Sequence, residues 1–151
     1  KFNFIGNGSG AEGVKQFILH NPHIDISLLP PIPFKHNNEG LFACDIAMVS
    51  LTEGMSGLAV PSKAYFSLAA DKPIFAIGDK GSELELLINE NDFIGWYSSS
   101  FNSAEIAKSI DKICDLDLSK FINKPRELID TKFNYNDSIN EYISVINSLE
   151  S

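Results

Sequence analysis

The residues best suited to chemistry follow an apolar segment, Asp45 to Leu51, that runs into a glycine-bearing loop. Glu53 lies just past the end of that segment, beside Gly54 and Gly57, and is the best placed carboxylate for a catalytic role. A carboxylate just past the end of a strand can act as a general acid or a general base. The alternative is an exposed loop glutamate without a chemical role.

A helix is predicted to begin at Pro61, because proline at the first helical position loses no hydrogen bond. The free N–H groups of a helix N-terminus, together with the helix dipole, form a site for anions. No acidic residue occurs between Glu53 and Asp71, and the only charge in the first turn is Lys63. A lysine there opposes the dipole, so a phosphate bound beside Ser62 and Lys63 accounts for it. A solvated lysine on an ordinary helix is the alternative.

A second glycine-rich loop, Gly6-Asn7-Gly8-Ser9-Gly10, follows a predicted strand over 2–5 and precedes a predicted helix over 11–19. Gly8 to Gly13 has the spacing of the dinucleotide fingerprint. That fingerprint needs an acidic residue at the end of the next strand, and here the strand ends in Leu28-Leu29-Pro30. We therefore disfavour a nicotinamide cofactor, although the loop backbone remains suited to a phosphate or a sugar.

Other classes of function are disfavoured by composition. The net charge of −8 argues against a nucleic-acid partner. Pro22 prevents His20 and His23 from sharing a helix face, and no cluster of cysteines or carboxylates completes a metal site. The sequence contains no apolar run of membrane-spanning length and no signal peptide, and its two cysteines lack a disulfide framework. These features predict a cytoplasmic protein.

The segments alternate between strands and helices, which predicts an α/β fold with a Rossmann-like parallel sheet and helices on both faces. We expect one domain over 1–151, with ligands bound at the loops that follow the strands. These loops are Gly6–Gly10, Pro30–Pro33, Thr52–Ser62 and Gly78–Ser82. Strands are predicted over 2–5, 23–29, 45–51, 73–77 and 93–97, and helices over 11–19, 38–44, 61–70, 82–89, 103–114, 124–131 and 137–149. Ser82 is predicted to cap the helix that runs to about Asn89, with Glu85 three residues on completing a capping box.

The order of these motifs resembles the carboxyl-terminal, donor-binding domain of GT-B-fold glycosyltransferases of the family-four type, which build bacterial surface polysaccharides such as capsule or lipopolysaccharide. The pattern Val-Pro-Ser-Lys followed by Leu-Ala-Ala-x-Lys-Pro is similar to transferases of amino sugars onto lipid-linked glycans. The residues that carry the resemblance are Phe4–Ser9, Leu41–Leu51, Val60–Lys63, Leu68–Pro73 and Gly95.

The resemblance implies transfer of a sugar from a nucleotide diphosphate-sugar, with a UDP-sugar as the expected donor and with retention at the anomeric carbon. It implies no metal and no other cofactor, because helix N-termini and basic side chains hold the diphosphate. By the same resemblance, the nucleotide crevice is lined by Gly6, Asn7, Gly8 and Ser9, the base is met by the loop that contains Pro31 and Ile32, and the diphosphate is met by Gly57, Pro61, Ser62 and Lys63.

The chain departs from the family pattern in two ways. The family places a glutamate that binds ribose seven residues before the proline of its turn, and Phe66 occupies that position. The family also has an earlier strand and helix and a whole acceptor domain before Lys1, so we expect a truncated fragment, inactive alone. Its exposed strand edges would favour a homodimer.

The resemblance also covers the terminal helix, about 137–149, which would cross toward the acceptor domain. That domain would bind a glycan or lipid-linked acceptor at the inner membrane.

Two other functions remain open. A nucleotide-sugar 2-epimerase shares the two-domain fold, but it needs several carboxylates and histidines where only Glu53 is well placed. A non-catalytic nucleotide-binding module is favoured by Phe66, which lacks the acceptor for the ribose.

Overall fold

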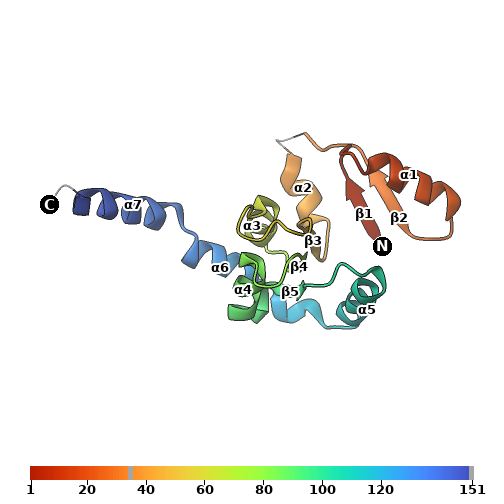
Figure 1. The fold of residues 1–151 in the computed structure, drawn as a ribbon. Coiled ribbons are helices and arrows are strands. Elements are labelled where there is room, and N and C mark those ends of the chain that lie inside the picture. The colour runs from red at the N-terminus through yellow and green to blue at the C-terminus, as the bar shows by residue number, and fades with distance from the viewer. Residues whose placement is uncertain (34–35, 150–151) are drawn as a thin grey trace. The chain divides into compact units, whose positions relative to one another are not determined.

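The computed structural model describes residues 1–33 and 36–149, and the chain forms two compact units, Lys1–Gly40 and Leu41–Ser151. Both are built of parallel strands with flanking helices, so the predicted α/β, Rossmann-like class is confirmed (Figure 1). No helix of the described residues is long and apolar enough to cross a membrane.

The amino-terminal unit is a β-α-β arrangement. Strands β1 (Phe2–Ile5) and β2 (Ile26–Leu29) pair in parallel, and α1 (Ala11–His20) connects them. The predicted strand 23–29 is too long, because the Ile24 N–H donates to the Asn21 carbonyl and makes a turn there. Asp25 then accepts the Phe2 N–H, so regular pairing starts at Ile26.

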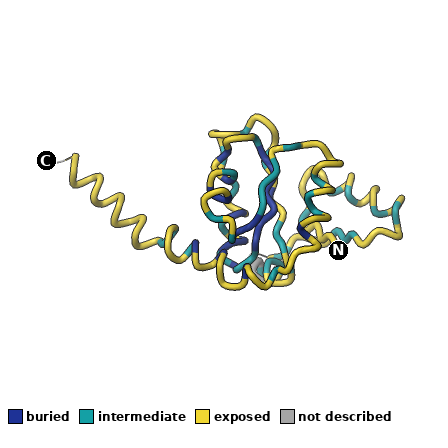
Figure 2. Tube along the Cα trace, turned by 90° about the horizontal axis from the view of Figure 1, so that it is seen from below, coloured by how far each residue is buried: buried dark blue, intermediate teal, exposed yellow. Residues whose placement is uncertain are grey.

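The carboxyl-terminal unit contains a three-stranded parallel sheet in the order β3-β4-β5. The strands are β3 (Ala47–Ser50), β4 (Ile74–Ile77) and β5 (Gly95–Ser98). Helix α2 (Asn37–Phe42) includes the boundary between the two units, which falls after Gly40, and precedes β3 in the chain. Every residue of the central strand β4 is buried (Figure 2). A strand buried on both faces needs a continuous apolar run, which Ile-Phe-Ala-Ile supplies.

The side chains of β4 alternate between two apolar clusters. Ile74 and Ala76 pack in one cluster with residues of α3 (Ser62–Ala69), α4 (Glu83–Glu90) and α6 (Lys124–Lys132). Phe75 and Ile77 pack in the other, with Ile113 of α5 (Ser103–Cys114). Because successive side chains of a strand point to opposite faces, helices cover both faces of this sheet.

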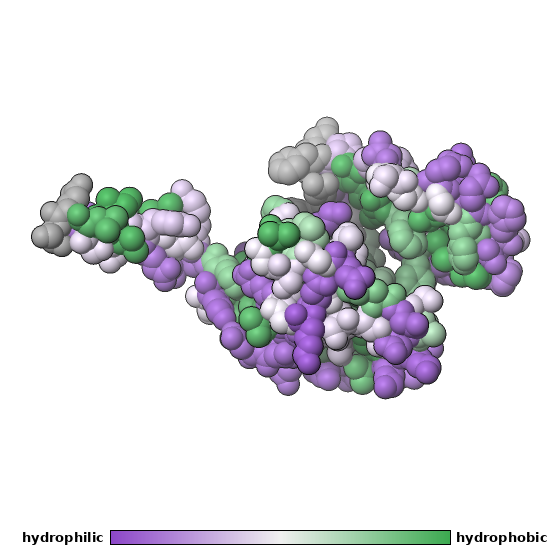
Figure 3. Space-filling view, viewed as in Figure 1, coloured by the Kyte–Doolittle hydropathy of each residue, from purple (hydrophilic) through white to green (hydrophobic). Residues whose placement is uncertain are grey.

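The described residues also form the short 3-10 helices η2 (Asp92–Ile94) and η3 (Leu118–Phe121) and the terminal helix α7 (Tyr135–Leu149). Helix α7 begins two residues before the predicted start at 137 and has no buried residue. Hydrophobic side chains gather along it (Figure 3). The exposed large apolar residues of α7 are Tyr135, Ile139, Tyr142, Ile143, Val145, Ile146 and Leu149.

Candidate functional site

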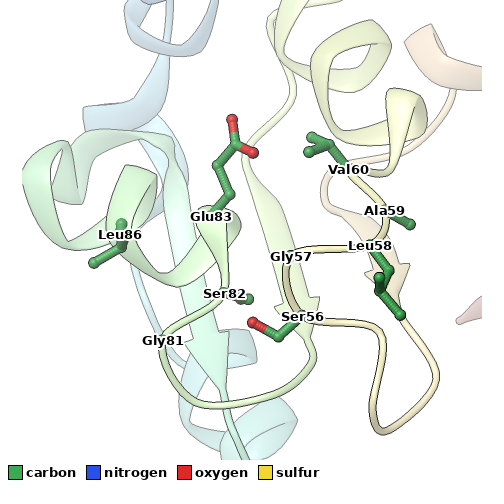
Figure 4. A pocket seen from close by; sticks show the side chains of 9 residues that line it. All are labelled: Ser56, Gly57, Leu58, Ala59, Val60, Gly81, Ser82, Glu83 and Leu86. Atoms are coloured by element: carbon green, nitrogen blue, oxygen red, sulfur yellow. The ribbon is translucent and has the colours of Figure 1, made fainter.

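A cavity of about 360 Å³ lies in the carboxyl-terminal unit, between the loop that follows β3 and the loop that follows β4 (Figure 4). Both loops leave the carboxyl ends of parallel strands, where α/β sheets bind ligands. The cavity is lined by Ser56, Gly57, Leu58, Ala59, Val60, Gly81, Ser82, Glu83 and Leu86. Among these nine lining residues of the described chain, Glu83 alone is charged.

The predicted diphosphate residues are only partly at this cavity. Gly57 lines it, whereas Pro61, Ser62 and Lys63 follow the last lining residue of the loop and are not among its walls. Ser62 and Lys63 are exposed at the start of α3. Glu53, the predicted catalytic carboxylate, is exposed in the loop and does not line the cavity.

Pro61 is not the first residue of α3, as predicted, but its N-cap. It has an extended conformation, with φ −74° and ψ 109°, and its carbonyl accepts the Ala64 N–H. The helical conformation therefore begins at Ser62. Pro61 contributes no capping side chain, so within the described residues no side chain caps the Ser62 and Lys63 N–H groups at the start of α3.

The start of α4 is capped by its own residues. The Ser82 hydroxyl accepts the Glu85 N–H at 3.4 Å, as the predicted capping box requires. The Glu85 carboxylate, however, accepts the N–H of Gly81 and not that of Ser82. The Ser82 N–H instead donates to the Asp79 carbonyl, at 3.2 Å.

Sequence analysis missed Asp79, whose carboxylate accepts two backbone N–H groups of the β3–α3 loop. The donors are Gly54 at 3.1 Å and Ser56 at 3.0 Å. These hydrogen bonds, first that from Gly54 and then that from Ser56, lower the pKa of Asp79. In the sequence, Asp79 is a carboxylate directly after Gly78, in the loop Gly78–Ser82 that was predicted to bind ligands. That position is the feature that could have indicated it.

Tyr97 of β5 lies behind these loops. Its hydroxyl donates to the Asp79 carbonyl at 2.7 Å and lies 2.6 Å from the Ser82 hydroxyl. Since a phenol has one proton to donate, Ser82 donates in the second bond. Burial raises the pKa of Tyr97, and the charges of Glu85 and Asp79 add to the increase.

Glu83 is near a second tyrosine. The Tyr65 hydroxyl donates to the Glu83 carboxylate at 3.4 Å, a long hydrogen bond. The ring of Tyr65 packs edge-to-face on Phe133, with centroids 5.1 Å apart. Burial and then the charge of Glu83 raise the pKa of Tyr65. Tyr65 therefore donates a hydrogen bond at neutral pH and does not serve as a base.

The amino-terminal unit has a cavity of its own, of about 340 Å³. Of the residues predicted to meet the nucleotide, Gly6, Asn7 and Pro31 line it, whereas Gly8, Ser9 and Ile32 do not. Gly6 has φ +134°, a conformation that side chains disfavour. The full lining set is Gly6, Asn7, Ala11, Glu12, Lys15, Leu28, Leu29, Pro30 and Pro31.

No group of three or more potential metal ligands occurs among the described residues. Two histidines of the described part of the chain lie in other settings. His20 is close to the Gln16 carbonyl on α1, with its Nδ1 atom at 2.7 Å, and His36 contacts the Glu39 carboxylate. Neither arrangement brings several ligands together.

The chain is similar to a known protein of greater length. Over 150 residues the chain is 40% identical to WbjE of Pseudomonas aeruginosa, described as a probable glycosyltransferase. The match covers 99% of this chain and 37% of the relative, so the chain spans little more than a third of that protein. No protein-family model matches the chain, and no solved structure matches it.

Proposed function

We propose that this chain is the donor-binding part of a glycosyltransferase that acts in polysaccharide synthesis. The observation that carries the proposal is the 40% identity to a probable glycosyltransferase, which extends over 99% of the chain. The α/β fold supports it, because a cavity lies where loops follow parallel strands. The residues that bind the acceptor are proposed to belong to a further part of the protein outside residues 1–151, because the relative is much longer than this chain.

The donor in this proposal is a nucleotide diphosphate-sugar, with UDP as the expected carrier, and the reaction retains the anomeric configuration. The diphosphate leaving group lies beside Gly57 and the exposed start of α3, at Ser62 and Lys63. Fixed N–H dipoles and one cation, without a metal ion, then stabilise the negative charge that grows on the leaving group. Glu53, in the loop that follows β3, is the proposed carboxylate at the sugar.

Thermal melting of the full-length protein with UDP, UDP-sugars and GDP-sugars tests the proposal. Ligands that bind only the native state raise the melting temperature by mass action. A rise with one nucleotide class supports donor binding and identifies the base. The absence of a shift with every nucleotide at millimolar concentration contradicts the proposal.

Lys63→Ala tests the place of the diphosphate. Hydrogen bonds to charged groups contribute about 1.5–3 kcal/mol, so loss of Lys63 should weaken UDP binding at least about ten-fold. Lys108→Ala is the matched control, because Lys108 is exposed on α5, against the opposite face of the sheet. Titration calorimetry with UDP measures both. Equal affinities for wild type and Lys63→Ala would remove Lys63 from the site.

A non-catalytic nucleotide-binding module is the second candidate, and Phe66 favours it. This side chain is 64% exposed on α3, where an apolar residue gains little from folding and offers no acceptor to a ribose. Phe66→Glu in the full-length protein should increase UDP affinity if the ribose passes this position. If Phe66→Glu leaves affinity unchanged and the wild type transfers no sugar, the non-catalytic function is favoured.

The exposed apolar face of α7 fits the proposed two-part protein. Seven large apolar or aromatic side chains of this helix are exposed, and none of its residues is buried. A helix with one apolar face is stable only when that face packs against something. We propose that α7 packs against the acceptor-binding part of the full-length protein.

A further inference from the structure

Asp79 connects the two loops that form the cavity. It belongs to the loop after β4, and both of its carboxylate oxygens accept N–H groups of the loop after β3. Oδ1 accepts from Gly54 at 3.1 Å and Oδ2 from Ser56 at 3.0 Å. A carboxylate that accepts two backbone N–H groups makes charge-assisted hydrogen bonds, which are stronger than neutral ones.

The Asp79 backbone is itself held by the sheet. Its carbonyl oxygen accepts the Tyr97 hydroxyl at 2.7 Å and the Ser82 N–H at 3.2 Å. Tyr97 belongs to β5, whose pairing with the buried strand β4 fixes its position. Tyr97, on a strand of the sheet, thus holds the Asp79 backbone, and the Asp79 carboxylate in turn holds a glycine-containing surface loop.

The same loop contributes to the cavity. Ser56 and Gly57 line one side of it, and Gly81 and Ser82 line the other (Figure 4). Asp79 takes up the N–H groups of Gly54 and Ser56, whereas the Gly57 N–H makes no hydrogen bond within the described part of the chain. Gly57 has φ +74°, so its position depends on how the flanking residues are held.

We propose that Asp79 is a positioning residue for donor binding: it fixes the Gly54–Ser56 backbone so that Gly57 is presented to the cavity before the ligand arrives. The inference rests on the proposed function, because it takes a nucleotide diphosphate-sugar as the ligand. A loop that is already ordered in the free protein loses little conformational entropy when the ligand binds. The affinity for the ligand is higher for that reason. Asp79 acts through the loop and has no contact with the ligand in this scheme.

The test compares Asp79→Asn with wild type in the full-length protein. Asparagine has one oxygen and an amide that cannot accept an N–H, so it cannot hold both Gly54 and Ser56. We expect faster amide hydrogen exchange at both residues and a rise of about five- to ten-fold in the dissociation constant of UDP, the cost of ordering a short loop. Calorimetry well below the melting temperature separates this effect from a loss of stability.

Asp117→Asn is the matched control. Asp117 also accepts a backbone N–H, that of Ser119 at 2.9 Å, and its pKa is lowered mainly for that reason, but it caps η3 and does not line the cavity. It should leave UDP affinity unchanged. If Asp79→Asn does not fold, Tyr97→Phe replaces it, since phenylalanine keeps the ring and removes the hydroxyl that bonds to the Asp79 carbonyl and to the Ser82 hydroxyl; a two-fold or larger rise in the dissociation constant, together with faster exchange at the Gly54 and Ser56 amides, is then expected.

Two results overturn the inference while leaving the proposed function intact. In the first, the Gly54 and Ser56 amides of Asp79→Asn exchange faster than in wild type, but the variant binds UDP with the same dissociation constant as wild type. The other is unchanged exchange at these amides. If wild type itself binds no UDP and no UDP-sugar, the proposed function fails, and the positioning role for a donor fails with it.

Discussion

Asp71 joins the turn after α3 to the start of α6. Its carboxylate accepts the Asn123 N–H at 2.7 Å and the Arg126 N–H at 3.2 Å, and so caps a helix more than fifty residues away. Asp71 has φ +58°, in the left-handed region that side chains other than those of Asn and Asp disfavour. Replacing Asp71 therefore lowers the free energy of unfolding in two ways, through loss of the helix cap and through strain in the left-handed backbone.

The substitutions Asp71→Asn, Asp71→Gly and Asp71→Ala separate these costs. Alanine loses the cap, about 1–2 kcal/mol, and also carries the strain of a left-handed conformation, about 1 kcal/mol or more, so the free energy of unfolding should fall by about 2–3 kcal/mol. Glycine loses only the cap and adopts the conformation freely. Asparagine tolerates the conformation and keeps one acceptor, so its loss should stay near about 0.5–1 kcal/mol.

Thermal and urea unfolding measure the series. For a domain of this size each kcal/mol corresponds to about 2–4 °C in melting temperature, so alanine should lower it by roughly 4–12 °C. Asp130→Ala is the control, since it removes only the exposed ion pair with Arg126, worth about 0.3–0.5 kcal/mol. A glycine variant as unstable as alanine would refute the strain argument. A full series within 0.5 kcal/mol of wild type would refute the capping argument as well.

Three further outcomes are expected. Gly95→Ala should yield no folded protein in expression and circular-dichroism assays, because a Cβ there would overlap the Ile74 carbonyl oxygen. Burial raises the pKa of the Cys44 thiol, so at pH 8 iodoacetamide should label the exposed Cys114 before Cys44, as mass spectrometry of timed samples will report. Hydrogen bonds lower the pKa of Asp79, so its stabilising effect is complete above the unfolded value of about 3.9 and is lost only as pH falls through the lower folded value; a carbon-13 NMR titration midpoint above 3.9 would contradict this.

The sequence predicted most elements because each carries a local signal. The helix over Ser103–Cys114 was predicted with the bounds that the structure has, since its apolar residues recur at helical spacing. The structure adds its cap, the side chain of Asn102, which accepts the Ala104 N–H. The buried strand β4 was predicted from one short apolar run between turns. Local signals of this kind need no knowledge of the rest of the fold.

The errors lie where a residue fits more than one local arrangement and the sequence pattern does not choose between them. Proline fits both the N-cap and the first helical position, and only the surrounding turn places Pro61 at the N-cap. In the same way, Glu85 fits the capping box, but its carboxylate accepts the N–H of Gly81. Predictions about donor residues stay predictions, since neither the geometry nor the comparisons test them.

The sequence by itself determined the α/β class, the order of the elements and the loops where a ligand could bind. It could do so because hydrophobic periodicity, caps and glycines act over a few residues. The tertiary structure alone decided how residues far apart in the chain meet. Asp79 reaches Gly54 and Ser56 across more than twenty residues, and Asp71 reaches Asn123 across 52. The sequence does not indicate which backbone N–H groups a carboxylate will bind, because every residue except proline has such a group and only the fold brings particular ones to it.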